Sequence, residues 1–299
     1  MPPDGVVAIV NPFAGAGATR DAPQVRQRLL EERFAAAGVT GCVRFTERAG
    51  HAGELARAAL DAGAALVIAW GGDGTINEIA SAVSGSRTPL GIVPAGSGNG
   101  FANELGLDSV PRRAIDTALL GRDRVIDGGE FDGRRFFNIA GTGLDAAVAE
   151  RFNTRPRGRR GLGPYLRITA RELMRYKSLR YRIRLDGDEI VTTALFVVFA
   201  NGREFGNRIR IAPGAKLDDG LLEAIVVEDR PPLARLWSSR FAALGRLERT
   251  PGMIVRGVRQ ASIETDREIV YQIDGETGRA PGRVEIRVVP ATLTVRVAR

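Results

Sequence analysis

The residues best suited to chemistry lie in one glycine-rich stretch, Ala69-Trp70-Gly71-Gly72-Asp73-Gly74-Thr75-Ile76-Asn77-Glu78. The apolar run 65–69 predicts a buried strand, and the amphipathic run 76–83 predicts a helix. Glycines between a strand and a helix let backbone N–H groups approach a phosphate, and the helix N-terminus adds positive partial charge. Asp73 then places a carboxylate beside the phosphates, suited to Mg²⁺ or to accepting a proton. The alternative is an ordinary tight turn, because Gly-Gly and Asp-Gly pairs form such turns.

Three other predicted strands end in loops that suit the same site. The apolar run Val6-Val7-Ala8-Ile9-Val10 leads into Asn11-Pro12-Phe13-Ala14-Gly15, residues 42–45 end at Thr46, and residues 90–93 open into Pro94-Ala95-Gly96-Ser97-Gly98-Asn99-Gly100. The strands alternate with helical patterns, which predicts a parallel sheet covered on both faces. Ligands of such sheets bind at the carboxyl ends of the strands, so we expect these loops to line one shared site.

After residue 127 the pattern changes to the two-residue alternation typical of half-buried strands. Apolar residues alternate with arginines over 179–185, and Asp186-Gly187-Asp188 predicts a hairpin turn. The sequence therefore predicts an α/β domain over 1–127 and a mostly antiparallel β domain over 128–290, with the last strand, 291–299, packing back on the first domain. In the second domain a helix is predicted over 233–247, and strands over 190–200, 221–227, 253–255, 261–264, 268–273, 283–289 and 293–297.

The formal net charge of +8 is concentrated in one segment. Residues 151–184 hold twelve Lys and Arg residues against the single acid Glu172, so this segment carries +11 and the rest of the chain carries −3. Such a segment suits an anionic membrane surface or a nucleic acid. The alternative is a helix packed on the β domain with a solvated arginine face. The helical pattern has an apolar face of Leu162, Tyr165, Leu166, Thr169, Leu173 and Tyr176 and a basic face of Arg160, Arg167, Arg171 and Arg175.

Other residue types exclude several classes of protein. The lone cysteine, Cys42, excludes an internal disulfide and a multi-cysteine zinc site, and the single histidine, His51, argues against histidine metal clusters. The longest apolar runs are far shorter than the ~20 residues that span a bilayer. The first residues, Met1-Pro2-Pro3-Asp4, lack the profile of a signal peptide, so we expect a cytoplasmic protein.

Taken together, these motifs resemble the diacylglycerol kinase catalytic-domain family, which includes soluble bacterial lipid kinases and sphingosine kinases. The matching stretches follow one another along nearly the whole chain, and the set is more specific than any single loop. They are Asn11-Pro12…Gly15, Thr46 with His51-Ala52, Gly71-Gly72-Asp73-Gly74-Thr75, Pro94-Ala95-Gly96-Ser97-Gly98-Asn99, Gly141-Thr142-Gly143-Leu144-Asp145, Lys216…Asp219-Gly220-Leu221 and Gln272-Ile273-Asp274-Gly275-Glu276.

The resemblance implies an ATP-binding N-terminal α/β domain, a C-terminal antiparallel β-sandwich domain that helps enclose a lipid, and an active site in the cleft between them. It implies a lipid kinase that uses ATP and Mg²⁺ to phosphorylate a hydroxyl of diacylglycerol or a related lipid. By the family pattern, the ATP-binding residues are Asn11, Pro12, Gly15, Thr46, Gly71, Gly72, Asp73, Gly74, Thr75, Asn77 and Ser97.

The resemblance also assigns roles in the second domain. A structural Mg²⁺ would be held by the Asp219 carboxylate and the main-chain carbonyls of Lys216 and Leu221, which are oxygen ligands suited to a hard cation; a plain type I turn is the alternative. Glu276 matches the family's proposed general base, or else faces solvent beside a hairpin turn. Asp73 is the rival for the base role. Asp145 resembles the acid that contacts the polar head of the lipid, or else is a helix N-cap.

One departure from the family pattern leaves the acceptor lipid open. This chain has Asn99-Gly100-Phe101-Ala102 where many bacterial diacylglycerol kinases have Asn-Asp-Phe-Ala. The missing aspartate belongs to an acidic and water network that reaches the metal; Asp127, another acid of that network, is present. The missing aspartate, together with Ser97 in place of threonine, favours sphingosine-kinase-like members.

Several alternatives and partners follow from this interpretation. The alternatives are a sphingoid-base kinase, a NAD kinase that shares the Gly-Gly-Asp-Gly loop and Asn77-Glu78, a basic nucleic-acid-binding protein, and a catalytically silent nucleotide-binding regulator. For the leading interpretation we expect the segment 151–184 to dock the enzyme peripherally on the anionic inner membrane surface, with no nucleic-acid partner. The sequence leaves a homodimer open.

Overall fold

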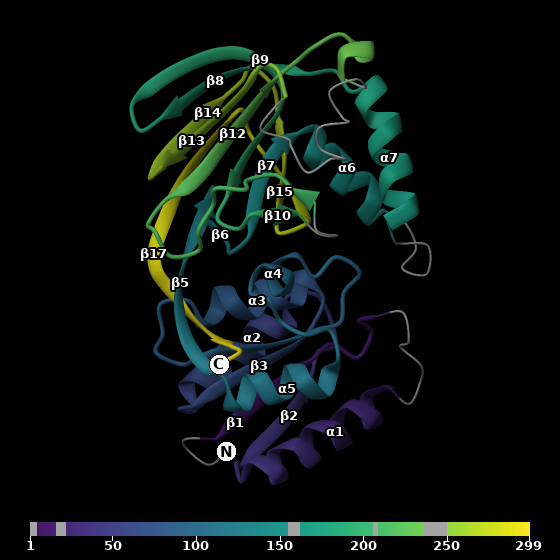
Figure 1. Cartoon of the computed structure of the whole chain (residues 1–299), viewed down its shortest axis with the longest axis vertical. Helices are drawn as coiled ribbons and strands as arrows, with labels where there is room; N and C mark the ends of the chain where they lie inside the picture. Colours follow the sequence, from purple (N-terminus) through teal and green to yellow (C-terminus); the bar gives the residue numbers. More distant parts are fainter. Residues whose placement is uncertain (1–4, 16–21, 155–161, 206–208, 236–249) are drawn as a thin grey trace. The chain divides into compact units, whose positions relative to one another are not determined.

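The computed structural model of the 299-residue chain describes residues 5–15, 22–154, 162–205, 209–235 and 250–299 (Figure 1). The chain divides into two compact units. Met1–Ile126 together with Ala291–Arg299 form the N-terminal unit, and Asp127–Pro290 form the C-terminal unit. Two strands, β5 (Arg122–Phe131) and β17 (Arg283–Val297), contribute residues to both units.

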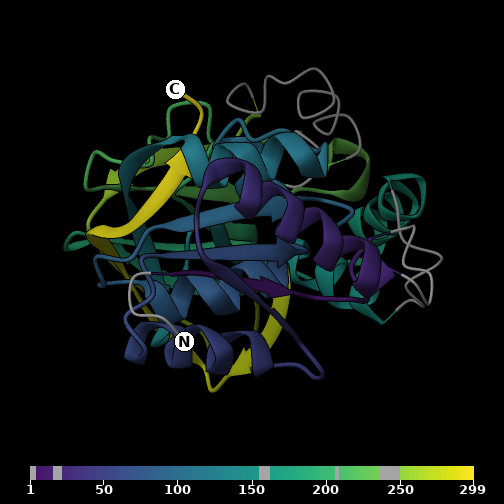
Figure 2. The ribbon, with the colours of Figure 1, turned by 90° about the horizontal axis from the view of Figure 1, so that it is seen from below.

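The N-terminal unit is an α/β structure built on parallel strands. In chain order its other elements are β1 (Val6–Val10), α1 (Ala22–Ala37), β2 (Gly41–Phe45), α2 (His51–Asp61), β3 (Leu66–Gly71), α3 (Asp73–Val83), β4 (Leu90–Pro94), α4 (Gly100–Glu104) and α5 (Pro111–Leu120). The strands lie in the order β2-β1-β3-β4, and β17 pairs in parallel with β4 through Val295 and Leu90. Figure 2 shows α1 and α5 on one face of these strands and α2 and α3 on the other.

The central strands of this sheet are apolar along both faces. β1 and β3 are buried over their whole length, as parallel strands covered on both sides are expected to be. Leu30 and Phe34 of α1 and Ile115 of α5 pack against them in one core cluster. Because β1, β3 and β4 are neighbours running in the same direction, the loops that follow them begin at one edge of the sheet.

The C-terminal unit is an antiparallel β-sandwich, as the family resemblance implied. Its elements are β6 (Arg134–Phe136), β7 (Ile139–Gly143), α6 (Leu144–Asn153), α7 (Leu162–Arg175), β8 (Leu179–Leu185), β9 (Asp188–Ala200), β10 (Glu204–Phe205), β11 (Ile209–Arg210), β12 (Leu222–Glu228), β13 (Met253–Val258), β14 (Gln260–Glu264), β15 (Ile269–Ile273) and β16 (Glu276–Ala280). The strand order is β16-β15-β7-β9-β8-β14-β17, β12 pairs with β9 and β13, and β5 pairs with β6.

The core of this unit comes from the apolar positions of the alternating strands. Tyr181, Ile183 and Leu185 of β8 are buried between exposed arginines and join one core cluster with Phe131 and Phe199. The Asp186-Gly187 hairpin joins β8 to β9 in register, with Leu185 opposite Asp188. The two-residue alternation therefore gives the burial pattern that it predicted.

Some predicted elements differ from those observed. The two strands predicted over 283–289 and 293–297 are one continuous strand, β17, which passes through Ala291 at a positive φ of 48°. Residues 236–249 of the helix predicted over 233–247 lie outside the described residues. The sequence analysis did not single out β5, β7, α4, α5 or α6.

The basic helix α7 packs through an apolar face that includes the predicted Leu173, with the predicted Tyr176 just after the helix, and adds Ile168. The predicted Arg160 and the side chains of Leu162, Tyr165 and Leu166 lie outside the described residues. Ile168 and Leu173 are buried in a cluster with Val148 of α6, whereas Arg167 and Arg171 are exposed. The acid of the segment, Glu172, is buried and pairs with Arg151 Nε (2.9 Å). Across the described residues, no helix combines the length and apolar character needed to cross a membrane.

Candidate active site

Hydrogen bonds join the loops of the N-terminal unit where β1, β3 and β4 end. The N–H of Asn11 donates to Trp70 O (2.9 Å), and the N–H of Ala95 donates to Gly71 O (2.8 Å). The side chain of Asn11 reaches the start of α3, where Nδ2 donates to Thr75 Oγ1 (2.9 Å). The structure therefore brings together the predicted ATP-binding residues Asn11, Gly71 and Thr75.

Glycines keep the corner between these loops free of side chains. A Cβ on Gly71 would lie 2.6 Å from the Cβ of Thr75, and a Cβ on Gly96 would lie 2.9 Å from the Cα of Gly72. Gly72 is the N-cap of α3, so the N–H groups of the first helical turn, which lack partners within the helix, follow it directly. A bare backbone at a helix N-terminus has the geometry and the positive partial charge to bind a phosphate.

Asp73 is the first residue of α3, three residues before the predicted helix start. Its Oδ2 accepts the N–H of Asn99 (2.9 Å), which ties the helix start to the loop after β4. Asn99 itself has a left-handed conformation (φ 50°), and its Oδ1 accepts the N–H of Gly96 (2.7 Å). The Asp73 carboxylate therefore lies beside the glycine corner, where the sequence placed it.

The other predicted ATP-binding residues lie on these loops, in α3 or, for Thr46, directly after β2. Thr46 is buried directly after β2, and its N–H donates to Val10 O (2.9 Å) at the end of β1. Ser97 is exposed in the loop after β4. The remaining ones are Pro12 and Gly15 after β1 and Gly74 and Asn77 in α3.

Arg26 of α1, which the sequence analysis missed, holds the loop after β1. Its guanidinium donates to Asn11 O (2.6 Å) and to Ala14 O, and it lies 5.3 Å from the ring centroid of Trp70. Burial lowers the pKa of Arg26. An isolated arginine within a helix gives no signal for such a role, because its partners are carbonyl groups that any residue carries.

Glu78, which the NAD kinase alternative invoked, binds the start of α2. Its Oε1 accepts the N–H of Gly50 (2.9 Å) and its Oε2 accepts the N–H of Ala52 (3.2 Å). Both carboxylate oxygens thus satisfy backbone donors at a helix N-terminus, a stabilising arrangement for an acid. This contact gives Glu78 a structural role in fixing α2 against α3.

In the C-terminal unit, the predicted Mg²⁺-binding residues lie on the turn before β12. Asp219 is exposed, its Oδ1 accepts the N–H of Leu221 (3.1 Å), and Gly220 turns the chain with a φ of 72°. Asp127 anchors this turn, because its Oδ2 accepts the N–H of Gly220 (2.7 Å). A second carboxyl lies nearby: burial and the charge of Asp219 raise the pKa of Glu223.

The donors on this turn fit a hard cation. An exposed carboxylate and backbone carbonyls are oxygen ligands of the kind that Mg²⁺ binds, and a cation offsets the repulsion between neighbouring carboxyls. Among the described residues, no cluster of three or more His, Cys, Asp and Glu side chains is arranged to hold a metal. A site here would therefore depend on the main-chain carbonyls of Lys216 and Leu221 as well as on Asp219.

Glu276 follows a two-residue hairpin turn that is anchored by its own aspartate. Asp274 and Gly275 both have positive φ (47° and 89°), as the alternative interpretation of this motif expected. The Asp274 carboxylate accepts backbone N–H groups of residues 137–139 at 2.9–3.0 Å. Glu276 is the first residue of β16, and its side chain is half-exposed. Its Oε2 lies 3.5 Å from Nη2 of Arg134. The hairpin turn and an accessible carboxylate thus occur together.

Asp145 lies in the first turn of α6. The alternative prediction that it is the N-cap of this helix is wrong, because the N-cap is Gly143. Its Oδ1 is buried and has no hydrogen-bond partner among the described residues, and its Oδ2 lies 3.4 Å from Gln272 Nε2. Burial raises the pKa of Asp145 to about 7, and the hydrogen bond from Gln272 opposes this shift only in part. Gln272 Oε1 also accepts the N–H of Gly275 (3.0 Å), which links Asp145 to the Glu276 hairpin.

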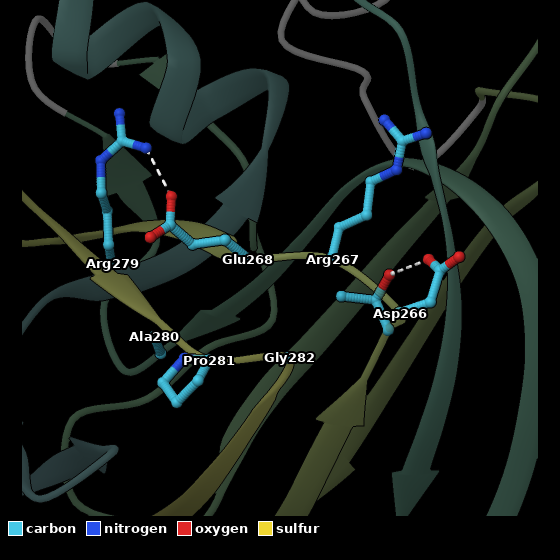
Figure 3. Close-up of a pocket in the computed structure, with 8 residues that line it drawn as sticks. Asp266, Arg267, Glu268, Arg279, Ala280, Pro281 and Gly282 are labelled. Carbon is cyan, nitrogen blue, oxygen red and sulfur yellow. Dashed lines mark hydrogen bonds and ion pairs between the residues drawn. The ribbon is translucent and has the colours of Figure 1, made fainter.

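A separate surface pocket of about 430 Å³ lies on the C-terminal unit and contains none of the predicted site residues (Figure 3). Its lining runs over 265–268 and 279–282. Arg279 is neutralised there by ion pairs with Glu268 (2.6 Å) and Glu150 (2.8 Å). The mixed charge of this pocket gives it no preference for an anionic substrate.

Comparisons with known proteins give one consistent result. The model of the diacylglycerol kinase catalytic domain matches residues 5–131, and the model of the YegS C-terminal NAD kinase beta sandwich-like domain matches residues 138–297. A protein of Chromohalobacter salexigens named "Probable lipid kinase YegS-like" is 35% identical over 71% of this chain and 68% of its own length. A Mycobacterium tuberculosis protein named "Diacylglycerol kinase" is 32% identical over 97% of this chain and 94% of its own.

Solved structures share the fold. A crystal structure of a diacylglycerol kinase from Bacillus anthracis covers 99% of this chain and 98% of its own, with a TM-score of 0.73 and 20% identity. Another chain solved from that organism reaches a TM-score of 0.82 at 23% identity, over 98% of this chain and 95% of its own. An NAD kinase from Archaeoglobus fulgidus in complex with ATP has a TM-score of 0.53 at 12% identity, over 97% of this chain and 93% of its own.

Proposed function

Because the chain belongs to the family of YegS-like lipid kinases and diacylglycerol kinases, we propose that it transfers the γ-phosphoryl group of ATP, with Mg²⁺, to a hydroxyl of diacylglycerol or a related lipid. One observation carries the nucleotide half of the proposal. The loops after β1, β3 and β4 are bonded together around glycines at the N-terminus of α3, with the Asp73 carboxylate beside them. The name of the mycobacterial relative supports diacylglycerol as the first acceptor to test.

In this proposal the nucleotide phosphates lie against the glycine corner. Backbone N–H groups after Gly71 and Gly72 donate to phosphate oxygens, and the α3 dipole favours their negative charge. Asn11 holds Thr75 in place, and Arg26 holds the loop that carries Asn11. These residues bind and orient the donor, which matters because phosphoryl transfer depends mainly on positioning and charge stabilisation.

The C-terminal unit supplies the groups proposed to act on the acceptor. Glu276 accepts the proton that the lipid hydroxyl loses as its oxygen bonds to the γ-phosphorus and ADP leaves. Asp73, which belongs to the N-terminal unit, is the competing candidate for that proton. Asp145, with its buried Oδ1 lacking a partner among the described residues, hydrogen-bonds the polar head of the lipid. Asp219 with the carbonyls of Lys216 and Leu221 would hold Mg²⁺, whose charge stabilises this region of the fold.

A membrane surface is the proposed source of the lipid. Arg167, Arg171 and Arg175 are exposed along α7, whose apolar residues Ile168 and Leu173 are used in packing. Each well-placed basic residue contributes about 1 kcal/mol toward anionic lipids. The protein should therefore co-sediment with vesicles that contain 30% phosphatidylserine at low salt and should dissociate from them at about 0.5 M NaCl, because salt screens these charges. Salt-insensitive sedimentation would contradict this docking.

The test of the proposed function is transfer of label from [γ-³²P]ATP·Mg²⁺ to a panel of acceptors. The panel contains diacylglycerol, monoacylglycerol, ceramide, sphingosine and NAD, each presented in the same mixed micelles or buffer. The proposal expects label on diacylglycerol or monoacylglycerol and none without Mg²⁺. Label on sphingosine would reassign the acceptor to a sphingoid base, label on NAD alone would overturn the lipid kinase activity, and no label on any acceptor would favour a binding role.

A further inference from the structure

One buried side chain outside the predicted site is connected by hydrogen bonds to both predicted parts of the site in the C-terminal unit, the Asp219 turn and the Glu276 hairpin. Asn201 directly follows β9 and is 0% exposed. Its Nδ2 donates to two backbone carbonyls, Asp127 O and Phe137 O, both at 2.9 Å. An asparagine Nδ2 has two N–H groups, so this amide nitrogen is fully used. Because each acceptor is a carbonyl, the network fixes which end of the amide is nitrogen.

The first hydrogen bond leads to the turn proposed to hold Mg²⁺. Asp127, whose carbonyl accepts from Asn201, is attached to this turn on both sides of Asp219. Its N–H donates to Leu217 O (2.6 Å), and its Oδ2 accepts the N–H of Gly220 (2.7 Å). A displacement of the Asp127 backbone would therefore move the turn that carries Asp219.

The second hydrogen bond leads to the hairpin that carries Glu276. Phe137, whose carbonyl accepts from Asn201, donates its N–H to Asp274 Oδ2 (2.9 Å). Asn138 and Ile139 donate to the other oxygen of the same carboxylate at 3.0 and 2.9 Å. The N–H of Asn201 donates in turn to Asn138 O (2.8 Å). The carboxylate of Asp274 thus attaches the hairpin turn to residues 137–139, and Asn201 hydrogen-bonds to the same segment.

We propose that Asn201 is a positioning residue, whose single amide fixes the Asp219 turn and the Glu276 hairpin relative to each other. Its catalytic consequence rests on the proposed lipid kinase activity, whereas the coupling itself is a property of the fold. Ala at this position removes both donors, and Ser retains one hydroxyl, which cannot donate to both carbonyls. Loss of the amide leaves two buried carbonyl oxygens to find new partners, so both segments shift or loosen.

Hydrogen–deuterium exchange tests the coupling without substrate. The variants are Asn201→Ala and the milder Asn201→Ser, compared with Ile183→Val as a matched control. Ile183 is fully buried in the same unit on β8 and contacts neither segment through the hydrogen bonds above. We expect about tenfold or faster exchange in peptides over 136–140 and 216–222 in the Asn201 variants, with wild-type exchange over 179–185. Ile183→Val should leave both segments protected.

Kinetics then separate positioning from general destabilisation. Asn201→Ser should lower kcat by about 10- to 100-fold, as small misplacements of reacting groups do, while KM for ATP stays within about twofold. In a Glu276→Ala background the same substitution should cost much less, because residues that act through one another are not additive. Ile183→Val should leave kcat unchanged.

Three results would overturn the proposal: exchange that changes only next to residue 201, equal kinetic losses with and without Glu276, or losses matched by Ile183→Val. The experiment also distinguishes the two claims. If the wild type phosphorylates no lipid but the two segments lose protection together, the proposed function fails and the coupling stands. If the wild type is active and the segments exchange independently, the coupling fails and the function stands.

Discussion

Replacing Asp145 with Asn should remove a titration that costs the protein stability near neutral pH. Burial raises the pKa of this carboxyl to about 7 from its ordinary 3.8, so between these values the folded chain keeps a proton that the unfolded chain releases. The unfolding free energy therefore falls as the pH rises through this range. At 1.36 kcal/mol per pH unit, the loss between pH 5 and pH 8 is about 3 kcal/mol. The amide of Asn has the same size and does not titrate, so the variant does not lose this stability as the pH rises.

The assay is urea unfolding of wild type and Asp145→Asn at pH 5, 6, 7 and 8, with the transition of the C-terminal unit fitted separately. The stability of the variant relative to wild type should increase by about 3 kcal/mol from pH 5 to pH 8. Asp266→Asn, which removes an exposed carboxylate from the same unit, is the control for the loss of one negative charge. Parallel pH profiles for wild type and Asp145→Asn would refute the account of a buried carboxyl with a raised pKa.

Three further predictions concern the loops. Gly71→Ala places a Cβ 2.6 Å from the Cβ of Thr75 and should raise KM for ATP at least tenfold in steady-state kinetics. The control is Gly91→Ala, whose Cβ would clash with Ala118 of α5 away from the loops; it should lower only the melting temperature. Arg26→Ala frees the loop after β1 and should raise KM for ATP by about tenfold with little change in kcat, by steady-state kinetics. Millimolar Mg²⁺ should raise the melting temperature of the wild type in differential scanning fluorimetry, and Asp219→Ala should abolish that increase; an increase that is the same in both would place the cation elsewhere.

The strand ends of the N-terminal unit could be predicted because the pattern that forms them is local. Val6–Val10 is apolar at every position and rich in β-branched residues, which is typical of a strand buried on both faces, and the run before the glycine loop has the same character. The same holds for β8, whose alternating arginines and apolar residues give its register with β9. The family resemblance is confirmed, whereas the roles of Glu276, Asp73, Asp219 and Asp145 remain predictions.

What could not be predicted depends on contacts between distant residues. Asn201 lies 74 residues from Asp127, and both of its bonds go to backbone carbonyls, which leave no trace in the pattern of side chains. The sequence predicts two strands, 283–289 and 293–297, where the structure has the single strand β17. Pro290 lacks a backbone N–H for the ladder, yet the strand continues through 290–292. β7 contains Gly141 and Gly143, whose missing side chains hide its alternation, and it is buried all the same.

The most direct test of the account is whether Asp73 and Glu276 are both needed for phosphoryl transfer to a lipid. We would measure transfer from [γ-³²P]ATP to diacylglycerol by wild type, Asp73→Asn and Glu276→Gln, each at saturating ATP and Mg²⁺, with Asp266→Asn as the control. The account predicts a labelled lipid with wild type and the control, and rates at least 100-fold lower with both site variants, although Glu276→Gln still binds ATP with wild-type affinity. Wild-type transfer rates in the two variants would contradict it.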